Sequence, residues 1–338
     1  MKRQFPIAIA LTVMLLAVGW GTGTQEKPAL PAAAAQAIPR ARAATGGYRL
    51  VEVRGEVQLM RAGERNSRPV TGNMELYPGD LLKVARGATA TVLCASNGQT
   101  WTLPDGLSGV TNGCPPENPI NPQLPQTRGQ VDQSSPYIIS PRQTALLNNR
   151  PKLRWNQVGG DSSYTVLIRG EDGMRWEKTV RAAEISYSGS PLKSGVTYQL
   201  IVQSGSGEGD SQEYATFWLL DEQTARTVRD RAVALSQQPW SEEEKAMATA
   251  DLYRAHNLIA EAIETLEALK GKTATVKRML GELYEWVGLA PQAQRHYSQV
   301  MGRSGDRPLG IGHAGIAWIA TTRDIAVFSW MKHTPETR

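Results

Sequence analysis

ADLYRAHNLIAEAIETLEAL, residues 250–269, decides the fold of the C-terminal part of the chain, because it recurs as GELYEWVGLAPQAQRHYSQV at residues 281–300. The two segments align without gaps at an offset of 31 residues. In each segment apolar residues return every three or four positions, which predicts two amphipathic helices. A unit that recurs at such a spacing indicates stacked helix pairs. The matched pairs are Leu252 and Leu283, Tyr253 and Tyr284, Leu258 and Leu289, Ala262 and Ala293, and Leu266 and Tyr297.

The repeated unit resembles the tetratricopeptide family, whose repeats are about 34 residues long. A small residue followed by Tyr on the first helix, and Ala with a large residue on the second, carry the resemblance, although the Trp and Pro of the full consensus are missing. The same offset carries Gly281 to Gly312, so GIGHAGIAWIA at residues 310–320 is expected to begin a further unit. Ser241-Glu242-Glu243-Glu244 has the capping-box form of a helix start. We expect an all-α tetratricopeptide-like array over residues 221–323 and a tail at residues 324–338.

Residues 137–220 favour strands. About seven short segments rich in β-branched and aromatic residues follow one another, as in an immunoglobulin-like sandwich. Trp155 is the expected core anchor. The segment Leu192-x-x-Gly195-x-x-Tyr198 is similar to the fibronectin type III pattern. That resemblance implies a corner hydrogen bond from the Tyr and a sandwich whose topology stays open.

Residues 48–115 also predict short strands with Gly-containing turns, which indicates a small β barrel or sandwich. The run Gly55-Glu56-Val57, then Leu76-x-x-Gly79-Asp80-x-Leu82, then the Asn97-Gly98 turn looks like the FecR-like β domain of bacterial envelope proteins. That resemblance implies an envelope context. The chain lacks the cytoplasmic signalling segment of some members, so a regulatory role does not transfer.

Residues 1–23 have the form of an export signal. Lys2 and Arg3 precede an uncharged run from Phe5 to Trp20, and small residues follow it. A retained membrane anchor is the alternative, although the run is shorter than the roughly 20 residues of a spanning helix. Residues 24–47 are expected to be a flexible tether, and residues 116–136 a Pro-rich linker. We expect an exported protein of the periplasm or cell envelope, in contact with the membrane only if this segment is uncleaved.

The chain has two cysteines, Cys94 and Cys114. Behind an export signal a pair most simply forms a disulfide, and two buried free thiols are the alternative.

The charge balance argues against a nucleic-acid partner. The net charge is +5, and the residues up to Ala43 carry most of it. No dense patch of Lys and Arg with interleaved aromatic residues follows, which is the pattern that nucleic-acid binders show.

Two short motifs and the histidines could suggest a catalytic, cofactor or metal site, but their sequence context argues against one. Residues 310–315 read G-x-G-x-x-G, but a turn precedes them and the next acidic residue, Asp324, is too close for a dinucleotide site. Residues 190–193 read S-x-x-K, but between two predicted strands. The four histidines lack the spacing of a helical metal site. We expect no catalytic residue, cofactor or metal, and we interpret Glu261, Glu264, Glu282 and Glu285 as exposed helix charges.

The favoured interpretation is a non-enzymatic envelope protein that binds other envelope proteins through its helical array, with a FecR-like β domain for sensing. Stacked helix pairs form a concave face, and its expected contact residues are Arg254, Asn257, Glu285 and Gln292. The β domain is expected to contact a cell-wall or envelope glycan or another protein. The alternative is a ligand-sensing or enzyme-associated subunit that binds a small molecule or glycan between domains, and convergent polar groups in a pocket would support it.

Overall fold

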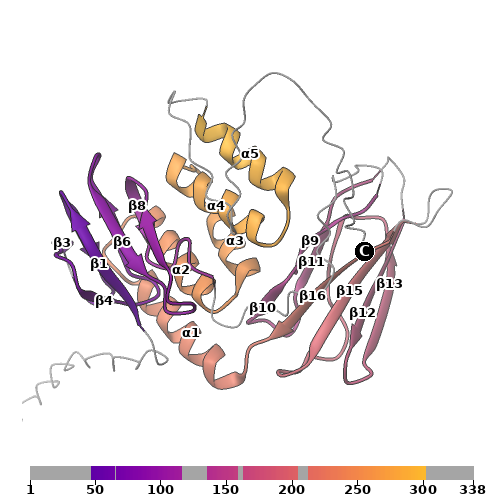
Figure 1. The fold of residues 1–338 in the computed structure, drawn as a ribbon. Helices are drawn as coiled ribbons and strands as arrows, with labels where there is room; N and C mark the ends of the chain where they lie inside the picture. Colours follow the sequence, from indigo (N-terminus) through magenta and orange to yellow (C-terminus); the bar gives the residue numbers. More distant parts are fainter. Residues whose placement is uncertain (1–46, 65, 116–134, 159–162, 205–211, 302–338) are drawn as a thin grey trace, which may run out of the picture. The chain divides into compact units, whose positions relative to one another are not determined.

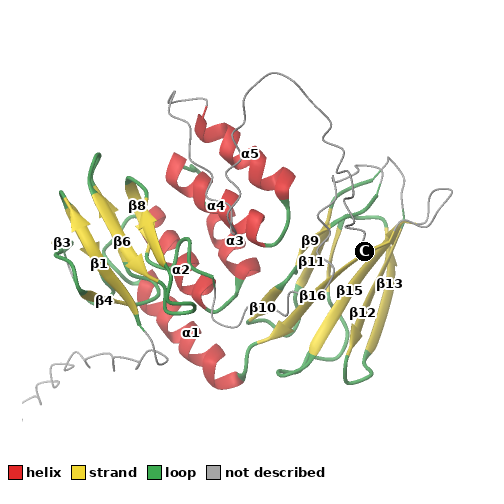
Figure 2. Ribbon diagram, in the orientation of Figure 1, coloured by secondary structure: helices red, strands yellow, loops and turns green. Residues whose placement is uncertain are grey.

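Two β-sheet modules and one helical module make up the described part of the chain (Figure 1). The computed structural model describes residues 47–64, 66–115, 135–158, 163–204 and 212–301. We call residues 47–115 the first β module, residues 135–220 the second β module and residues 221–301 the helical module. The strands precede the helices along the chain, as the colours of Figure 1 show, and Figure 2 distinguishes strands from helices. The expected leader, most of the linker, the further repeat at residues 310–320 and the tail lie outside the described residues.

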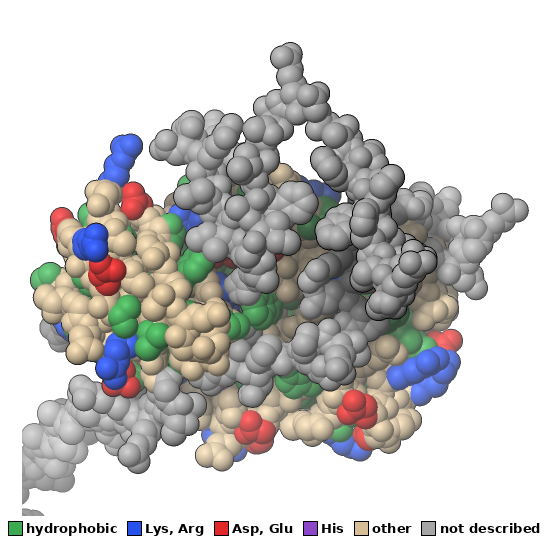
Figure 3. Space-filling view, in the orientation of Figure 1, with side chains coloured by type: hydrophobic (Ala, Val, Ile, Leu, Met, Phe, Trp, Pro, Cys, Tyr) green, Lys and Arg blue, Asp and Glu red, His purple; other side chains and the backbone are tan. Residues whose placement is uncertain are grey.

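The first β module contains two antiparallel four-stranded sheets, in the orders β4-β1-β6-β7 and β3-β2-β5-β8. Alternate side chains such as Leu50, Leu59 and Val92 point between the sheets and are fully buried. On the face drawn in Figure 3, Lys and Arg side chains are interspersed with Asp and Glu. The strands are β1 (Tyr48–Arg54), β2 (Val57–Met60), β3 (Arg68–Pro69), β4 (Met74–Leu76), β5 (Leu81–Val84), β6 (Thr89–Leu93), β7 (Thr100–Leu103) and β8 (Gly106–Gly109).

A disulfide between Cys94 and Cys114 links the end of β6 to the turn after β8, with the Cα atoms 5.5 Å apart. Beside it, Gly113 has a φ of +81°, and an added Cβ there would lie 2.1 Å from the Trp101 ring. Only glycine fits this turn, because both the backbone conformation and the indole exclude a side chain. A disulfide of this kind indicates an oxidising environment.

The second β module packs a five-stranded sheet, β10-β16-β15-β12-β13, against a three-stranded sheet, β14-β11-β9. Trp155 and Tyr164 meet edge to face in its core, with ring centroids 5.5 Å apart. The Tyr198 hydroxyl accepts a hydrogen bond of 2.8 Å from the Lys193 amide. The strands are β9 (Ile138–Ser140), β10 (Thr144–Leu146), β11 (Lys152–Trp155), β12 (Tyr164–Gly170), β13 (Arg175–Val180), β14 (Glu184–Ser186), β15 (Thr197–Ser204) and β16 (Gln212–Leu219).

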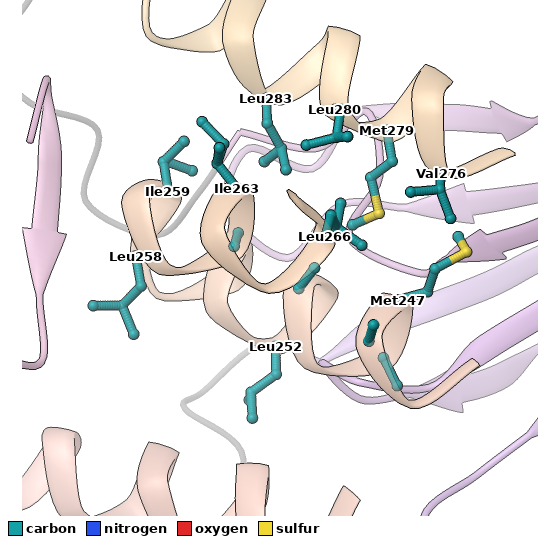
Figure 4. Close-up of a cluster of buried hydrophobic side chains, with 14 of the residues drawn as sticks. Met247, Leu252, Leu258, Ile259, Ile263, Leu266, Val276, Met279, Leu280 and Leu283 are labelled. Carbon is teal, nitrogen blue, oxygen red and sulfur yellow. The ribbon is translucent and has the colours of Figure 1, made fainter. Parts of the chain in front are cut away.

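The helical module contains α1 (Glu222–Ser236), α2 (Glu242–Ala255), α3 (Ile259–Glu267), α4 (Ala274–Trp286) and α5 (Ala290–Met301). The predicted capping box starts α2, since the Ser241 hydroxyl accepts from the Glu244 amide and the Glu244 carboxylate accepts from the Ser241 amide. Leu, Ile, Met and Val side chains from α2, α3 and α4 meet in one apolar core (Figure 4). Among the described residues no helix is long and apolar enough to cross a membrane.

The 31-residue repeat is present in the backbone. The pairs α2–α3 and α4–α5 each turn through a residue of positive φ, Asn257 at 56° and Gly288 at 77°, and these two residues are equivalent in the alignment. The amide that follows each one bonds to the carbonyl of Tyr253 or Tyr284. Gly281 lets the helices of the second pair approach closely, because an added Cβ there would lie 2.4 Å from the Tyr297 ring.

A buried carboxylate joins the first β module to the helical module. Asp251 of α2 is fully buried and accepts hydrogen bonds from the amide of Gly79 (2.9 Å) and from the amide (2.9 Å) and hydroxyl (2.7 Å) of Thr111. Burial nevertheless raises the pKa of Asp251 to about 6. The Leu-x-x-Gly-Asp turn of the first β module therefore directs its Gly79 amide at α2, and we call this contact the Asp251 joint.

A second set of buried polar contacts joins the second β module to the helical module. Arg142 pairs with Glu213 at 2.8 Å, and its Nε donates to the Val287 carbonyl at the end of α4, also at 2.8 Å. The amide of Leu147 donates to the Glu261 carboxylate of α3 at 2.7 Å. These contacts, which we call the Arg142 joint, bring one edge of the β module against α3 and α4.

Candidate functional site

Three of the four contact residues expected from the sequence are buried, so their expected exposure is wrong. Arg254 donates to Asn112 of the first β module at 2.6 Å, and its guanidinium lies 3.9 Å from Glu282. Asn257 is the left-handed residue that ends α2, and Gln292 packs against the second β module. Glu285 is exposed, and its carboxylate accepts a 2.9 Å hydrogen bond from the Tyr297 hydroxyl. The β modules cover the surfaces that the repeat alone would leave open.

Glu261 and Glu282 are likewise not the exposed helix charges that the sequence suggests. In each carboxylate one oxygen, Oε2, is buried without a hydrogen-bond partner. Burial raises the pKa of Glu261 to about 7 and also raises the pKa of Glu282. Both lie under a β module. Glu261 accepts from the Leu147 amide of the second β module, and Glu282 lies beside Arg254, which donates to Asn112 of the first.

The candidate site is a cleft of about 600 Å³ between the second β module and the helical module. Its size lies within the range of small-molecule sites in proteins. We call it the interface cleft and define it by its lining, which is Tyr137, Ile139, Arg154, Asn156 and Gln157 from the β module and Glu267, Tyr284, Gln292, Arg295 and His296 from the helices.

Strand alternation explains the β-module wall. In β11 the side chains of Leu153 and Trp155 are buried in the module's core, so Arg154 between them points out of the sheet toward the helices. Asn156 follows the strand and is held on two sides, since its carbonyl oxygen accepts from the Tyr137 amide and its amide donates to the Ser135 carbonyl at 3.2 Å. The wall therefore presents a guanidinium and a fixed amide.

Residues at the ends of α3 and α4 form the deepest part of the helical side of the cleft. The Glu267 carboxylate accepts from the Tyr284 hydroxyl and pairs with Arg154 at 3.3 Å across the cleft. Burial and the adjacent Glu267 carboxylate raise the pKa of Tyr284, so this phenol stays protonated and donates to the carboxylate. Glu267 is thus fully engaged by protein groups.

The first turns of α5 supply polar atoms without protein partners. Gln292 is 8% exposed, and its Nε2 donates to the Tyr137 hydroxyl at 2.8 Å, while its Oε1 is buried and bonded to no atom of the described residues. One turn later His296 lies flat on the Tyr284 ring, with centroids 5.5 Å apart and planes 8° apart. Its Nδ1 is also buried without a partner. Buried polar atoms of this kind are uncommon and need an explanation.

The interface cleft offers aromatic faces, amides and cations, which are groups that bind a ligand. Burial lowers the pKa of His296 more than the Glu267 carboxylate raises it, and the nearby charges of Lys272, Lys277 and Arg295 lower it further, so the imidazole is neutral at neutral pH. Among the described residues no group of three or more His, Cys, Asp or Glu side chains is placed to hold a metal ion.

One feature of the repeat indicates this site, and of the expected contact residues only Gln292 belongs to it. Position 261 of the first repeat and position 292 of the second are equivalent, and the structure turns both toward the second β module. A polar residue at the same place on the second helix of each pair is therefore a docking position. The sequence pointed to Gln292 but assigned it to an open face.

No family model matches the chain, and no curated protein gives a significant match. Function is therefore inferred from the geometry of the interface cleft and from the residues that line it.

Proposed function

We propose that this protein is a non-enzymatic, exported envelope protein that binds a small ligand in the interface cleft. The observation that carries the proposal is the pair of buried, unpartnered atoms on α5, Gln292 Oε1 and His296 Nδ1, at the wall of a cleft that also presents Arg154 and Arg295. A bound ligand that bonds to these two atoms would remove the cost of leaving them unpaired, about 1–3 kcal/mol each.

The modular description belongs to the same proposal. We interpret the first β module as FecR-like, the second as fibronectin type III-like and the helical module as tetratricopeptide-like, in a protein of the periplasm or cell envelope. The disulfide supports an exported setting. In this description the repeat helices bind the two β modules of the same chain, and the ligand occupies the space left between one module and the helices.

Protein binding through the array stays a weaker candidate. Of its four expected contact residues Glu285 alone is exposed, because the neighbouring modules bury the others. A scaffold role would have to use the outer faces of the helices, whereas the interface cleft already combines concavity with polar groups that lack partners.

The test is ligand-observed NMR with the full chain and a panel of neutral saccharides, acidic saccharides and short peptides. We expect at least one class to bind, and the Gln292→Leu variant to weaken that binding about tenfold. Gln294→Leu is the matched control, because Gln294 lies on the same helix, is exposed and does not line the cleft. Absence of binding throughout the panel, or equal binding by both variants, would refute the proposal.

A further inference from the structure

The chemistry of the interface cleft narrows the class of ligand, and this step rests on the proposed function. The two unpartnered atoms determine which hydrogen-bonding groups the ligand must carry. Gln292 Oε1 is an acceptor, and the neutral His296 ring presents Nδ1 as an acceptor when its proton is on Nε2. A ligand that satisfies both must bring hydroxyl or N–H donors. Chloride and sulfate have none to give, and an apolar molecule would leave both atoms unpaired.

The charge of the lining residues determines the charge that the ligand must carry. Arg154 is paired with Glu267, and that carboxylate also accepts from Tyr284. Arg295 is exposed and forms no ion pair with a carboxylate in the described parts of the chain. Lys272 adds positive charge near His296, and within the described ranges its ammonium bonds to the backbone carbonyls of Glu267 and Leu269 and to no side chain. A surplus of cations favours a ligand with one acidic group.

The shape of the lining separates saccharides from peptides. Tyr137 and His296 are half-buried ring side chains in the lining, and the buried Tyr284 stacks on one face of the His296 ring and fixes its orientation. A pyranose ring has a flat C–H face for such surfaces and hydroxyl groups at its rim for amides. Ile139 is the single aliphatic side chain among the lining residues, so the cleft lacks an apolar pocket for a peptide side chain.

We infer that the interface cleft binds a saccharide that carries a carboxylate, with the ring against the aromatic side chains, its hydroxyl or acetamido donors on Gln292 and His296, and its carboxylate on Arg295. The cleft of about 600 Å³ has room for one or two sugar rings. Arg295 is the residue that selects the acidic sugar over its neutral counterpart.

The test compares N-acetylmuramic acid with N-acetylglucosamine, which lacks the lactyl carboxylate but is otherwise the same amino sugar. Affinities are measured by NMR titration with the full chain and with Arg295→Gln, Arg295→Lys and Arg226→Gln. Arg226 is the matched control, because it is an exposed arginine on α1 away from the cleft. We expect the acidic sugar to bind about fivefold more tightly than the neutral one. Arg295→Gln should abolish this difference, and Arg295→Lys and Arg226→Gln should keep it.

The outcomes separate this inference from the proposed function. Equal affinity for the two sugars, a preference that survives in Arg295→Gln, or binding of a peptide but of neither sugar would overturn the acidic-saccharide inference. In each of these cases a loss of binding in Gln292→Leu would still support a ligand in the cleft. Because Arg295 is exposed, its variants are expected to fold, and circular dichroism with thermal unfolding verifies this before titration.

Discussion

Glu261 shows how one buried carboxyl couples the Arg142 joint to pH. Its Oε1 accepts from the Leu147 amide at 2.7 Å, while its Oε2 is buried with no partner. The ionised form is therefore poorly solvated, and burial raises the pKa to about 7 from the ordinary 4.5, with the Glu264 carboxylate adding to the shift. A protonated Glu261 fits the joint better than an ionised one.

Glu261→Gln should change how stability depends on pH. Because the folded-state pKa exceeds the unfolded one, the stability linked to this group is fully present below about pH 4.5 and is lost as pH rises through about 7. Glutamine keeps the acceptor for Leu147 and does not ionise. We expect the variant to gain about 2 kcal/mol over the wild type between pH 5 and pH 8. Urea denaturation at the two pH values measures this gain.

Glu171→Gln is the control for this experiment, because Glu171 is an exposed glutamate on the second β module. Its stability should follow the wild type at both pH values. The buried Asp251, whose pKa is also raised, contributes equally to all three proteins and cancels in the comparison. An unchanged pH dependence in Glu261→Gln would contradict the assignment.

Among the helices, α3 depends on a strand for its first turn. Leu258 occupies its N-cap position and makes no side-chain cap. The hydroxyl of Thr144, from β10, accepts instead from the amides of Ile259 (2.9 Å) and Ala260 (3.3 Å). The chain thus caps one helix with a residue from a distant strand, and this places β10 directly against α3.

Removing this hydroxyl should weaken α3 and leave the other helices intact. Thr144→Val keeps the shape of the side chain but leaves the Ile259 and Ala260 amides without an acceptor, so we expect a loss of about 1–2 kcal/mol. Hydrogen exchange should quicken at those two amides. Thr144→Ser retains the hydroxyl and should stay near the wild type. Equal behaviour of the two variants would show that the hydroxyl does not cap the helix.

Long, strongly periodic elements could be predicted from the sequence, and short strands only in part, since β5 and β11 were predicted and others were not. Strands β12, β15 and β16 and the helices of the repeat lie where apolar spacing indicates them, because they are long enough to show a period. β3, β4, β8 and β10 have only two to four residues each, and no apolar pattern in the sequence indicates them. β10 runs parallel to β16 and packs on α3, so its existence depends on partners distant in the sequence.

The candidate site was harder to predict for a related reason. The repeat shows which side of each helix faces its neighbouring helix, but it does not show that a β module covers the remaining side. Arg254, Asn257 and Gln292 therefore look exposed in the sequence and are buried in the structure. Predicting the disulfide required only two cysteines and an export signal, and the prediction agrees with the structure.

At the scale of the whole molecule, the described residues belong to one compact unit of the chain. The sequence suggests three modules, with a Pro-rich linker at residues 116–136 between the first two. The structure joins them through buried polar groups, with Asp251 on one side and Arg142 with Thr144 on the other. Buried hydrogen-bonded groups need defined partners, since each one that loses its partner costs about 1–3 kcal/mol. The modules should therefore unfold as one.

Asp251→Ala should uncouple the first β module while leaving the interface cleft in place. The substitution leaves the Gly79 and Thr111 amides without an acceptor, and we expect the free energy of unfolding to fall by about 3 kcal/mol. Hydrogen exchange should quicken in β5 and β8 and stay slow in β12 and β15, because the Arg142 joint is untouched. Asp230→Ala, on the exposed side of α1, should leave hydrogen exchange unchanged in all four strands.

Ligand binding in the cleft should survive Asp251→Ala and be lost in Arg142→Met, which breaks the contact with Val287. Uniform acceleration over all three modules, or loss of binding in Asp251→Ala, would mean that the two joints do not act separately.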